Sequence, residues 1–261
     1  MVTKRLARYG DWKSPITVDT VTSKSWSVAS PRVHRRTGRA FFIESKDDGR
    51  QGIVEITRDG LSDLLAAPYS AGNTVYEYGG SAHDVIADGR IIFSNRDNTV
   101  KILEPDTGKV SDLTGKPKLR YSNFSANPNS PWVLAIEEDH EIETPKGIRN
   151  YIVAINADNG EVKRVVEGAD FYYTPQFSAD GKRLTWMEWN QPDLPFAAAK
   201  VFAADWTSLA SVENLVLVAG QNREGAAEPR WGLDGSLFVC IEIDGFRQLC
   251  RMALEKKSHL T

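Results

Sequence analysis

The chain has 261 residues, of which 41% are hydrophobic and 26% are charged, and its formal net charge at pH 7 is −3. This balance is typical of a folded protein, because a disordered chain would have fewer apolar residues. The slight acidic excess argues against a nucleic-acid or membrane-surface binder, and no apolar run approaches the ~20 residues of a membrane-spanning helix. The basic N-terminus is not followed by an apolar signal-like segment, and only two cysteines are present, so we expect a cytoplasmic protein.

The first part of the chain predicts a lead-in followed by short strands. Residues 1–26 are interpreted as an extended lead-in, with Tyr9, Trp12 and Pro15 as anchors onto a larger body, and residues 27–261 as one domain. Strand pairs are predicted over 40–44 with 53–57 and over 91–95 with 99–104. Between these pairs, residues 75–82 predict an aromatic strand that a glycine pair interrupts, which indicates a bulge or a close backbone approach.

The second part repeats one local pattern. After a third unit with strands over 133–138 and 151–156, residues 175–184 read PQFSADGKRL, which is typical of a strand, a tight turn at Gly181 and a second strand. The pattern returns around Gly235, and the spacing of the two glycines is close to the ~50-residue repeat of some propeller blades. Fainter copies surround Gly38 and Gly89.

These units predict an all-β fold, a β-propeller with about four complete four-stranded blades and a partial fifth. Residues 184–189 are largely apolar on both sides of the strand, as expected for a sheet that is covered on both faces. Propellers close on themselves to hide their edges, so an incomplete fifth blade predicts self-association or a partner that completes the propeller.

Two clusters could carry chemistry, and each has a simpler interpretation. Ser81 and His83 would share a face of a strand, but no third group or oxyanion hole accompanies them, so we interpret them as ordinary strand residues. The acidic loop over 137–143 could offer oxygens to a cation, but it lacks the spacing of a calcium loop and is interpreted as a solvated loop. The tryptophans are interpreted as packing between blades rather than as a stacking surface. We therefore expect no catalytic residue, no metal site and no cofactor.

Several motifs occur together in one order along the chain. They are RYGDWKSPI at 8–16, YEYGG at 76–80, LRY at 119–121, EEDH at 137–140, GADFY at 168–172 and PQFSADGKRLTWMEW at 175–189. In this order they resemble the N-terminal β-propeller of the prolyl oligopeptidase family, in its dipeptidyl aminopeptidase and acylaminoacyl-peptidase branch. The chain departs from that pattern at Tyr76, where relatives usually have His, and at 195–197, where Pro-Phe-Ala stands for Pro-Trp-Asp.

The resemblance implies a propeller that admits small peptides to a serine peptidase domain, an α/β-hydrolase with a Ser-Asp-His triad. No Gly-x-Ser-x-Gly elbow occurs in the sequence, so the expectation is a truncated family member that is not catalytic alone. Two alternatives remain: a free-standing propeller used for binding or as a scaffold, and a repurposed propeller enzyme acting on a small molecule in its channel. The candidate residues for an interface or a channel mouth are Glu77, Tyr78, Trp189 and Asp193.

Overall fold

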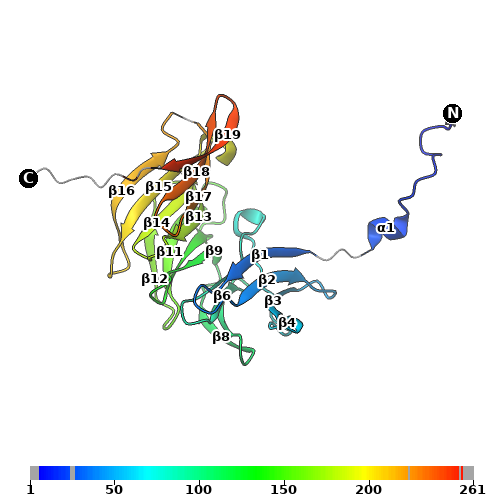
Figure 1. The fold of residues 1–261 in the computed structure, drawn as a ribbon, viewed down its shortest axis with the longest axis horizontal. Coiled ribbons are helices and arrows are strands. Elements are labelled where there is room, and N and C mark those ends of the chain that lie inside the picture. The colour runs from blue at the N-terminus through cyan, green and yellow to red at the C-terminus, as the bar shows by residue number, and fades with distance from the viewer. Residues whose placement is uncertain (1–5, 24–26, 223, 253, 255–261) are drawn as a thin grey trace, which may run out of the picture.

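The computed structural model describes residues 6–23, 27–222, 224–252 and 254, and it shows an all-β propeller of five blades (Figure 1). Each blade is an antiparallel sheet in which strands follow one another in sequence order. Within the described residues, four blades have four strands and the fifth has three, which confirms the predicted fold class. None of the described helices is long and apolar enough to cross a membrane.

The strands of the blades are as follows. Blade 1 contains β1 (Val28–Val33), β2 (Ala40–Ser45), β3 (Gln51–Thr57) and β4 (Gly60–Asp63), and blade 2 contains β5 (His83–Val85), β6 (Ile91–Ser94), β7 (Val100–Glu104) and β8 (Lys109–Thr114). Blade 3 contains β9 (Leu119–Ala126), β10 (Trp132–Asp139), β11 (Arg149–Asn156) and β12 (Val162–Val166). Blade 4 contains β13 (Phe171–Phe177), β14 (Arg183–Trp189), β15 (Lys200–Trp206) and β16 (Val212–Ala219), and blade 5 contains β17 (Ala226–Trp231), β18 (Leu237–Ile243) and β19 (Phe246–Met252).

Apolar clusters between successive blades hold the propeller together. Both faces of the central strands carry apolar residues, so each blade can bury one face against the preceding blade and the other against the next. In β14, for example, Leu184 and Trp186 pack toward blade 3, whereas Met187 packs toward blade 5. Trp186 is buried, which confirms that this tryptophan packs between blades.

The faces of blades 1 and 5 that point away from their neighbours keep apolar side chains exposed. In blade 1, the paired residues Ile56 and Leu61 are 55% and 58% exposed, and Val33 lies on the same face. In blade 5, Leu249 of β19 is exposed opposite Cys240, whereas Val239 on the other face is fully buried. Cys240 and Cys250 are free thiols.

In the part of the chain that the structure describes, three short helical segments lie outside the sheets. Helix α1 (Val18–Thr22) lies in the lead-in, far from the blades in Figure 1, and α2 (Pro195–Ala198) follows β14. Tyr9 and Trp12 are exposed and contact each other rather than the blades, so the prediction that they anchor the lead-in is not met within this chain. The segment predicted as an aromatic strand contains the 3₁₀ helix η1 (Val75–Glu77) instead.

Candidate functional site

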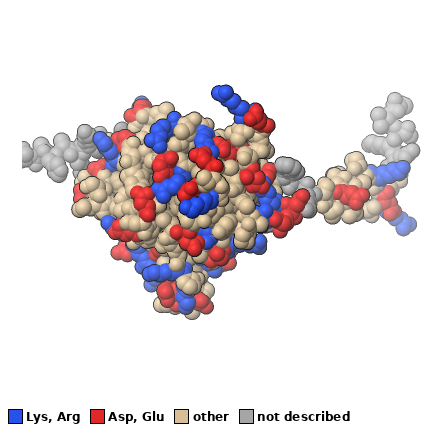
Figure 2. All heavy atoms as spheres, turned by 90° about the horizontal axis from the view of Figure 1, so that it is seen from below, with Lys and Arg blue, Asp and Glu red and all other residues tan. Residues whose placement is uncertain are grey.

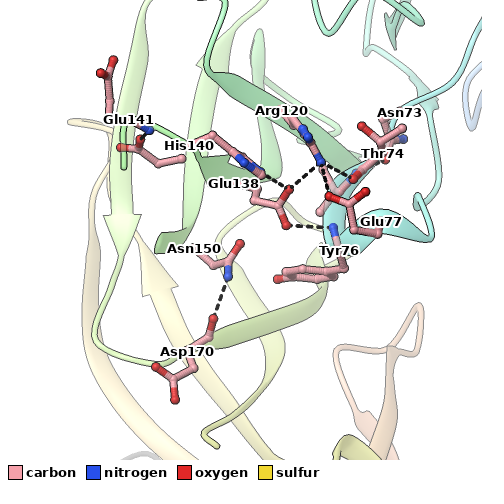
Figure 3. Close-up of polar contacts among 12 residues, drawn as sticks. Asn73, Thr74, Tyr76, Glu77, Arg120, Glu138, His140, Glu141, Asn150 and Asp170 are labelled. Atoms are coloured by element: carbon pink, nitrogen blue, oxygen red, sulfur yellow. Dashed lines mark hydrogen bonds and ion pairs between the residues drawn. The ribbon is translucent and has the colours of Figure 1, made fainter. Parts of the chain in front are cut away.

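A cluster of charged and aromatic residues lies at one end of the propeller, where η1, the start of β9 and the end of β10 meet (Figure 3). Its centre is Glu138, whose side chain is only 5% exposed. Nε2 of His140 lies 2.6 Å from Oε1 of Glu138, and the Arg120 guanidinium lies 3.4 Å from the same oxygen. The backbone N–H of Tyr76 donates to Oε2 over 2.8 Å. A buried carboxylate is thus paired with positive and polar groups, as burial requires.

Strand register explains this grouping. Arg120 in β9 is the direct cross-strand partner of Glu138 in β10, so their side chains leave the sheet on the same face. His140 follows Glu138 by two residues, which returns it to that face. The predicted acidic loop is therefore partly wrong: Glu137 and Asp139, like Glu138, belong to β10 and not to a loop.

The loop between blades 1 and 2 brings Glu77 to the cluster in an unusual backbone conformation. Tyr76 and Glu77 both have positive φ, 56° and 62°. Such a conformation costs about 1–3 kcal/mol for a non-glycine residue and persists only where neighbours hold it. Here the Asn73 side chain bonds both the N–H and the C=O of Gly80, which closes the loop, and the Tyr76 N–H is bound to Glu138.

Arg120 connects this loop to blade 3. Its Nη1 donates to the Thr74 carbonyl and to Oε1 of Glu77, each over 2.9 Å. The hydrogen bond from Arg120 holds the pKa of Glu77 below its ordinary value, so Glu77 is an exposed carboxylate that stays ionised. The arrangement presents a negative oxygen to solvent on a fixed backbone.

An aromatic row continues from the loop to blade 4. The Tyr76 hydroxyl donates to the Tyr172 carbonyl over 2.9 Å, and burial raises its pKa well above the ordinary value. Its ring meets the edge of Phe171 at 5.5 Å, and Phe171 stacks on Trp189 at 5.3 Å. Tyr76, which stands where a histidine is usual in the resembled family, therefore has a packing role between blades.

The four candidate residues have different environments. Glu77 accepts a hydrogen bond from Arg120, and Trp189 stacks on Phe171, which in turn contacts Tyr76. Tyr78 is 96% exposed, and Asp193 is half-buried in the loop after β14, where its N–H donates to the Asn190 carbonyl. The structure therefore keeps all four at the same end of the strands, and Glu77 and Trp189 contact the cluster.

The residues selected from the sequence did not include Arg120, Glu138 and His140, which form the centre of the cluster. Their signal was present, since LRY and EEDH are among the motifs of the resemblance. The selected residues also did not include Asn150, whose Nδ2 donates to the Asp170 carbonyl and whose Oδ1 is buried without a partner among the described residues. Nothing in the sequence around Asn150 distinguishes it from an ordinary strand residue.

Ser81 and His83 do not form a nucleophile and base. Arg32 donates to the Ser81 hydroxyl over 2.6 Å, and that hydroxyl points to the backbone carbonyl of His83 rather than to its ring. The imidazole is fully buried, and neither nitrogen has a partner among the described residues. No group of His, Cys, Asp or Glu within the described part of the chain has a metal-binding arrangement. The cluster can bind and orient a group, but it contains no activated nucleophile.

Comparison with solved structures identifies similar propellers. The match to a Mycobacterium tuberculosis puromycin-hydrolysing peptidase covers 95% of this chain and 40% of the peptidase, with a TM-score of 0.82 and 29% sequence identity. A puromycin hydrolase matches 92% of this chain and 39% of its own, with a TM-score of 0.77 and 25% identity. Oligogalacturonate lyase in complex with manganese matches 87% of this chain and 63% of its own, with a TM-score of 0.66; at 13% identity it shows a similar fold alone.

No protein-family model matches the sequence, and a search of curated proteins gives no match. The chain spans about 40% of the length of the puromycin-hydrolysing peptidases. It is homologous to their N-terminal propeller, which confirms the resemblance to the prolyl oligopeptidase-type propeller found in the sequence.

Proposed function

We propose that this chain is the substrate-access propeller of a serine peptidase related to puromycin hydrolases, and that it performs no bond chemistry itself. The observation that carries this proposal is the match of 95% of the chain to the propeller part of such a peptidase. A propeller in this role admits small peptides and excludes folded proteins. A hydrolase domain, in this polypeptide or in another one, supplies the triad.

The cluster around Glu138 supports an interface at its end of the propeller. Glu77 presents an ionised carboxylate beside the exposed ring of Tyr78, and Arg120 fixes its position. A carboxylate held in this way can accept hydrogen bonds from the amino group of a peptide or from a neighbouring domain. We assign this end of the propeller to contact with the hydrolase domain or its peptide substrate.

Activity of the purified chain tests the first part of the proposal. Puromycin and an aminoacyl-arylamide are incubated with the chain, and we expect no release of product above the buffer rate. Ser81→Ala is the matched variant, because Ser81 is the serine that the sequence placed beside a histidine. Turnover that copurifies with the chain and disappears in Ser81→Ala would contradict the proposal.

The coding region tests the second part. A hydrolase partner predicts that the same or an adjacent reading frame encodes a Gly-x-Ser-x-Gly elbow on a strand–turn–helix segment. A gene neighbourhood without any α/β-hydrolase sequence would favour the alternative, a free-standing binding propeller.

The exposed apolar residues of blades 1 and 5 favour this alternative, a free-standing propeller that binds another protein. Large apolar areas are uncommon on soluble monomers and mark interaction surfaces. A second copy or a partner protein in the cytoplasm would cover Ile56 and Leu61 on blade 1 and Leu249 on blade 5. The oligomeric state of the purified chain tests whether a second copy covers these residues.

A further inference from the structure

The inner strands of the five blades line a central cavity of about 990 Å³. It extends to the turns after β1, β9 and β13, which lie at the opposite end of the strands from the Glu138 cluster. Its volume lies at the upper end of the ~300–1,000 Å³ range of small-molecule sites, so a short peptide would fit. The cavity contains none of the residues discussed for the Glu138 cluster.

One residue from each blade occupies an equivalent position around this cavity. Inner strands β1, β9, β13 and β17 each have a bulge with a non-glycine residue at positive φ: Ser30, Asn123, Thr174 and Glu228. Two residues after each of these, and at Asp84 in blade 2, a side chain lines the cavity; these five are Arg32, Asp84, Ser125, Gln176 and Arg230. Bulges re-aim side chains, and here their repetition arranges a ring of polar groups.

The lining of the cavity carries more positive than negative side chains, although the whole chain is slightly acidic. Four arginines line the cavity, Arg32, Arg35, Arg36 and Arg230, and Asp84 is the one acidic residue among its described lining. Asp84 is already paired, since its Oδ1 lies 3.3 Å from Nε of Arg32 and its Oδ2 accepts the Ala126 N–H. A cleft lined by one sign of charge concentrates ligands of the opposite sign. Figure 2 shows basic and acidic side chains interspersed over the face that it presents.

The four arginines differ in how far the protein uses their N–H groups. Arg32 pairs with Asp84 and donates to the Ser81 hydroxyl and the Pro31 carbonyl. Arg36 donates to the Ala87 carbonyl over 2.6 Å, and Arg230 pairs with Glu228 over 2.8 Å and donates to the Pro229 carbonyl. Arg35 has a single hydrogen bond among the described residues, a long one of 3.5 Å to the Ala179 carbonyl in blade 4. That bond crosses from the β1–β2 turn to the β13–β14 turn, so the guanidinium lies over the cavity with most of its donors unused.

Thr174 also lines the cavity, but its hydroxyl oxygen is turned away from the open space. The Thr174 hydroxyl is buried and has no hydrogen-bond partner among the described residues. Thr174 belongs to the strained bulge of β13, next to the ring position Gln176.

We propose that the central cavity binds the anionic group of a small ligand, a carboxylate or a phosphate, with Arg35 as its main anchor. Guanidinium groups bind planar carboxylates and phosphates through paired hydrogen bonds. This site does not depend on the proposed peptidase role, because it lies within this chain.

Isothermal titration calorimetry on the purified chain tests the proposal with three probes: trialanine with a free C-terminal carboxylate, trialanine C-terminal amide, and inorganic phosphate. Trialanine acid or phosphate is expected to bind at low ionic strength and to weaken as salt is added. The amide is expected to bind at least tenfold more weakly than the acid if the source of charge is a carboxylate. Tighter binding of phosphate than of trialanine acid would instead assign a phosphate group.

Two variants separate the site from general charge effects. Arg35→Gln removes the guanidinium and is expected to weaken binding of the better anion roughly tenfold or more. Arg58→Gln changes net charge equally at an exposed turn outside the cavity and is expected to leave binding unchanged. Because Arg35 is exposed and has one long bond, Arg35→Gln should unfold at the wild-type temperature. Binding of neither anion, or equal binding by Arg35→Gln and the wild type, would overturn the proposal.

Discussion

His83 should make the stability of this propeller depend on pH in a defined window. The imidazole is 0% exposed in β5, and neither nitrogen has a hydrogen-bond partner among the described residues. Burial, together with the nearby positive charge of Arg32, lowers the pKa of His83 from 6.5 to about 3. Between about pH 3 and 6.5, therefore, the folded protein holds this ring neutral whereas the unfolded chain protonates it.

The magnitude follows from this difference in pKa. Above pH 6.5 the ring is neutral in both states and contributes no pH dependence. Below pH 6.5 the unfolded chain binds a proton that the folded chain does not, so the free energy of unfolding falls by about 1.4 kcal/mol per pH unit until the pH approaches 3. At pH 5 this residue alone lowers stability by about 2 kcal/mol, a large fraction of the ~5–15 kcal/mol of a typical domain.

The variant His83→Leu removes the titrating group and keeps a side chain of similar volume. Urea unfolding at pH 7.5 and at pH 5 gives the pH-dependent loss of stability for the wild type and for the variant. We expect the loss to be smaller by about 2 kcal/mol in His83→Leu, because other groups titrate equally in both proteins. Equal losses in the two proteins would refute the burial of a neutral, unpartnered His83.

The remaining predictions concern turns, surfaces and activity. Gly181→Ala should cost about 1–3 kcal/mol, because φ is +68° and the new Cβ would lie 2.6 Å from Oδ1 of buried Asn127; Gly38→Ala, at a similar φ of +74° but in open space, should cost less in the same thermal unfolding assay. Light scattering after size-exclusion chromatography should show self-association that Ile56→Lys combined with Leu61→Lys reduces, and a monodisperse wild-type monomer of 29.0 kDa would contradict this. Puromycin should remain intact in the presence of the purified chain, as mass spectrometry of the mixture can check.

Local sequence determined the blades. A strand, a turn with glycine at positive φ and a second strand depend on residues that are neighbours in the chain, so PQFSADGKRL predicted the β13–β14 hairpin without knowledge of the rest. Apolar residues on both faces of a strand likewise predicted that the blades stack on both sides. The order of several such motifs predicted the resemblance that the solved structures confirm.

Tertiary structure determined the backbone conformation of the segment around Tyr76, where the sequence predicted a strand. Its positive-φ backbone is held by a hydrogen bond from the Tyr76 N–H to Glu138, a residue in another blade. Aromatic residues beside a glycine pair favour a strand by local propensity, and that preference was overridden by a contact between residues far apart in the chain.

For the same reason, the sequence did not predict the Glu138 cluster or the site in the central cavity. Arg120 meets Glu138 because β9 and β10 pair in one register, and Arg35 reaches over the central cavity because the turns of blades 1 and 4 face each other. Single positions such as these have no local signature, since their chemistry comes from the partners that the propeller brings to them. The sequence by itself determined that strands of this kind form blades, and the packing of the blades determined which charged side chains meet.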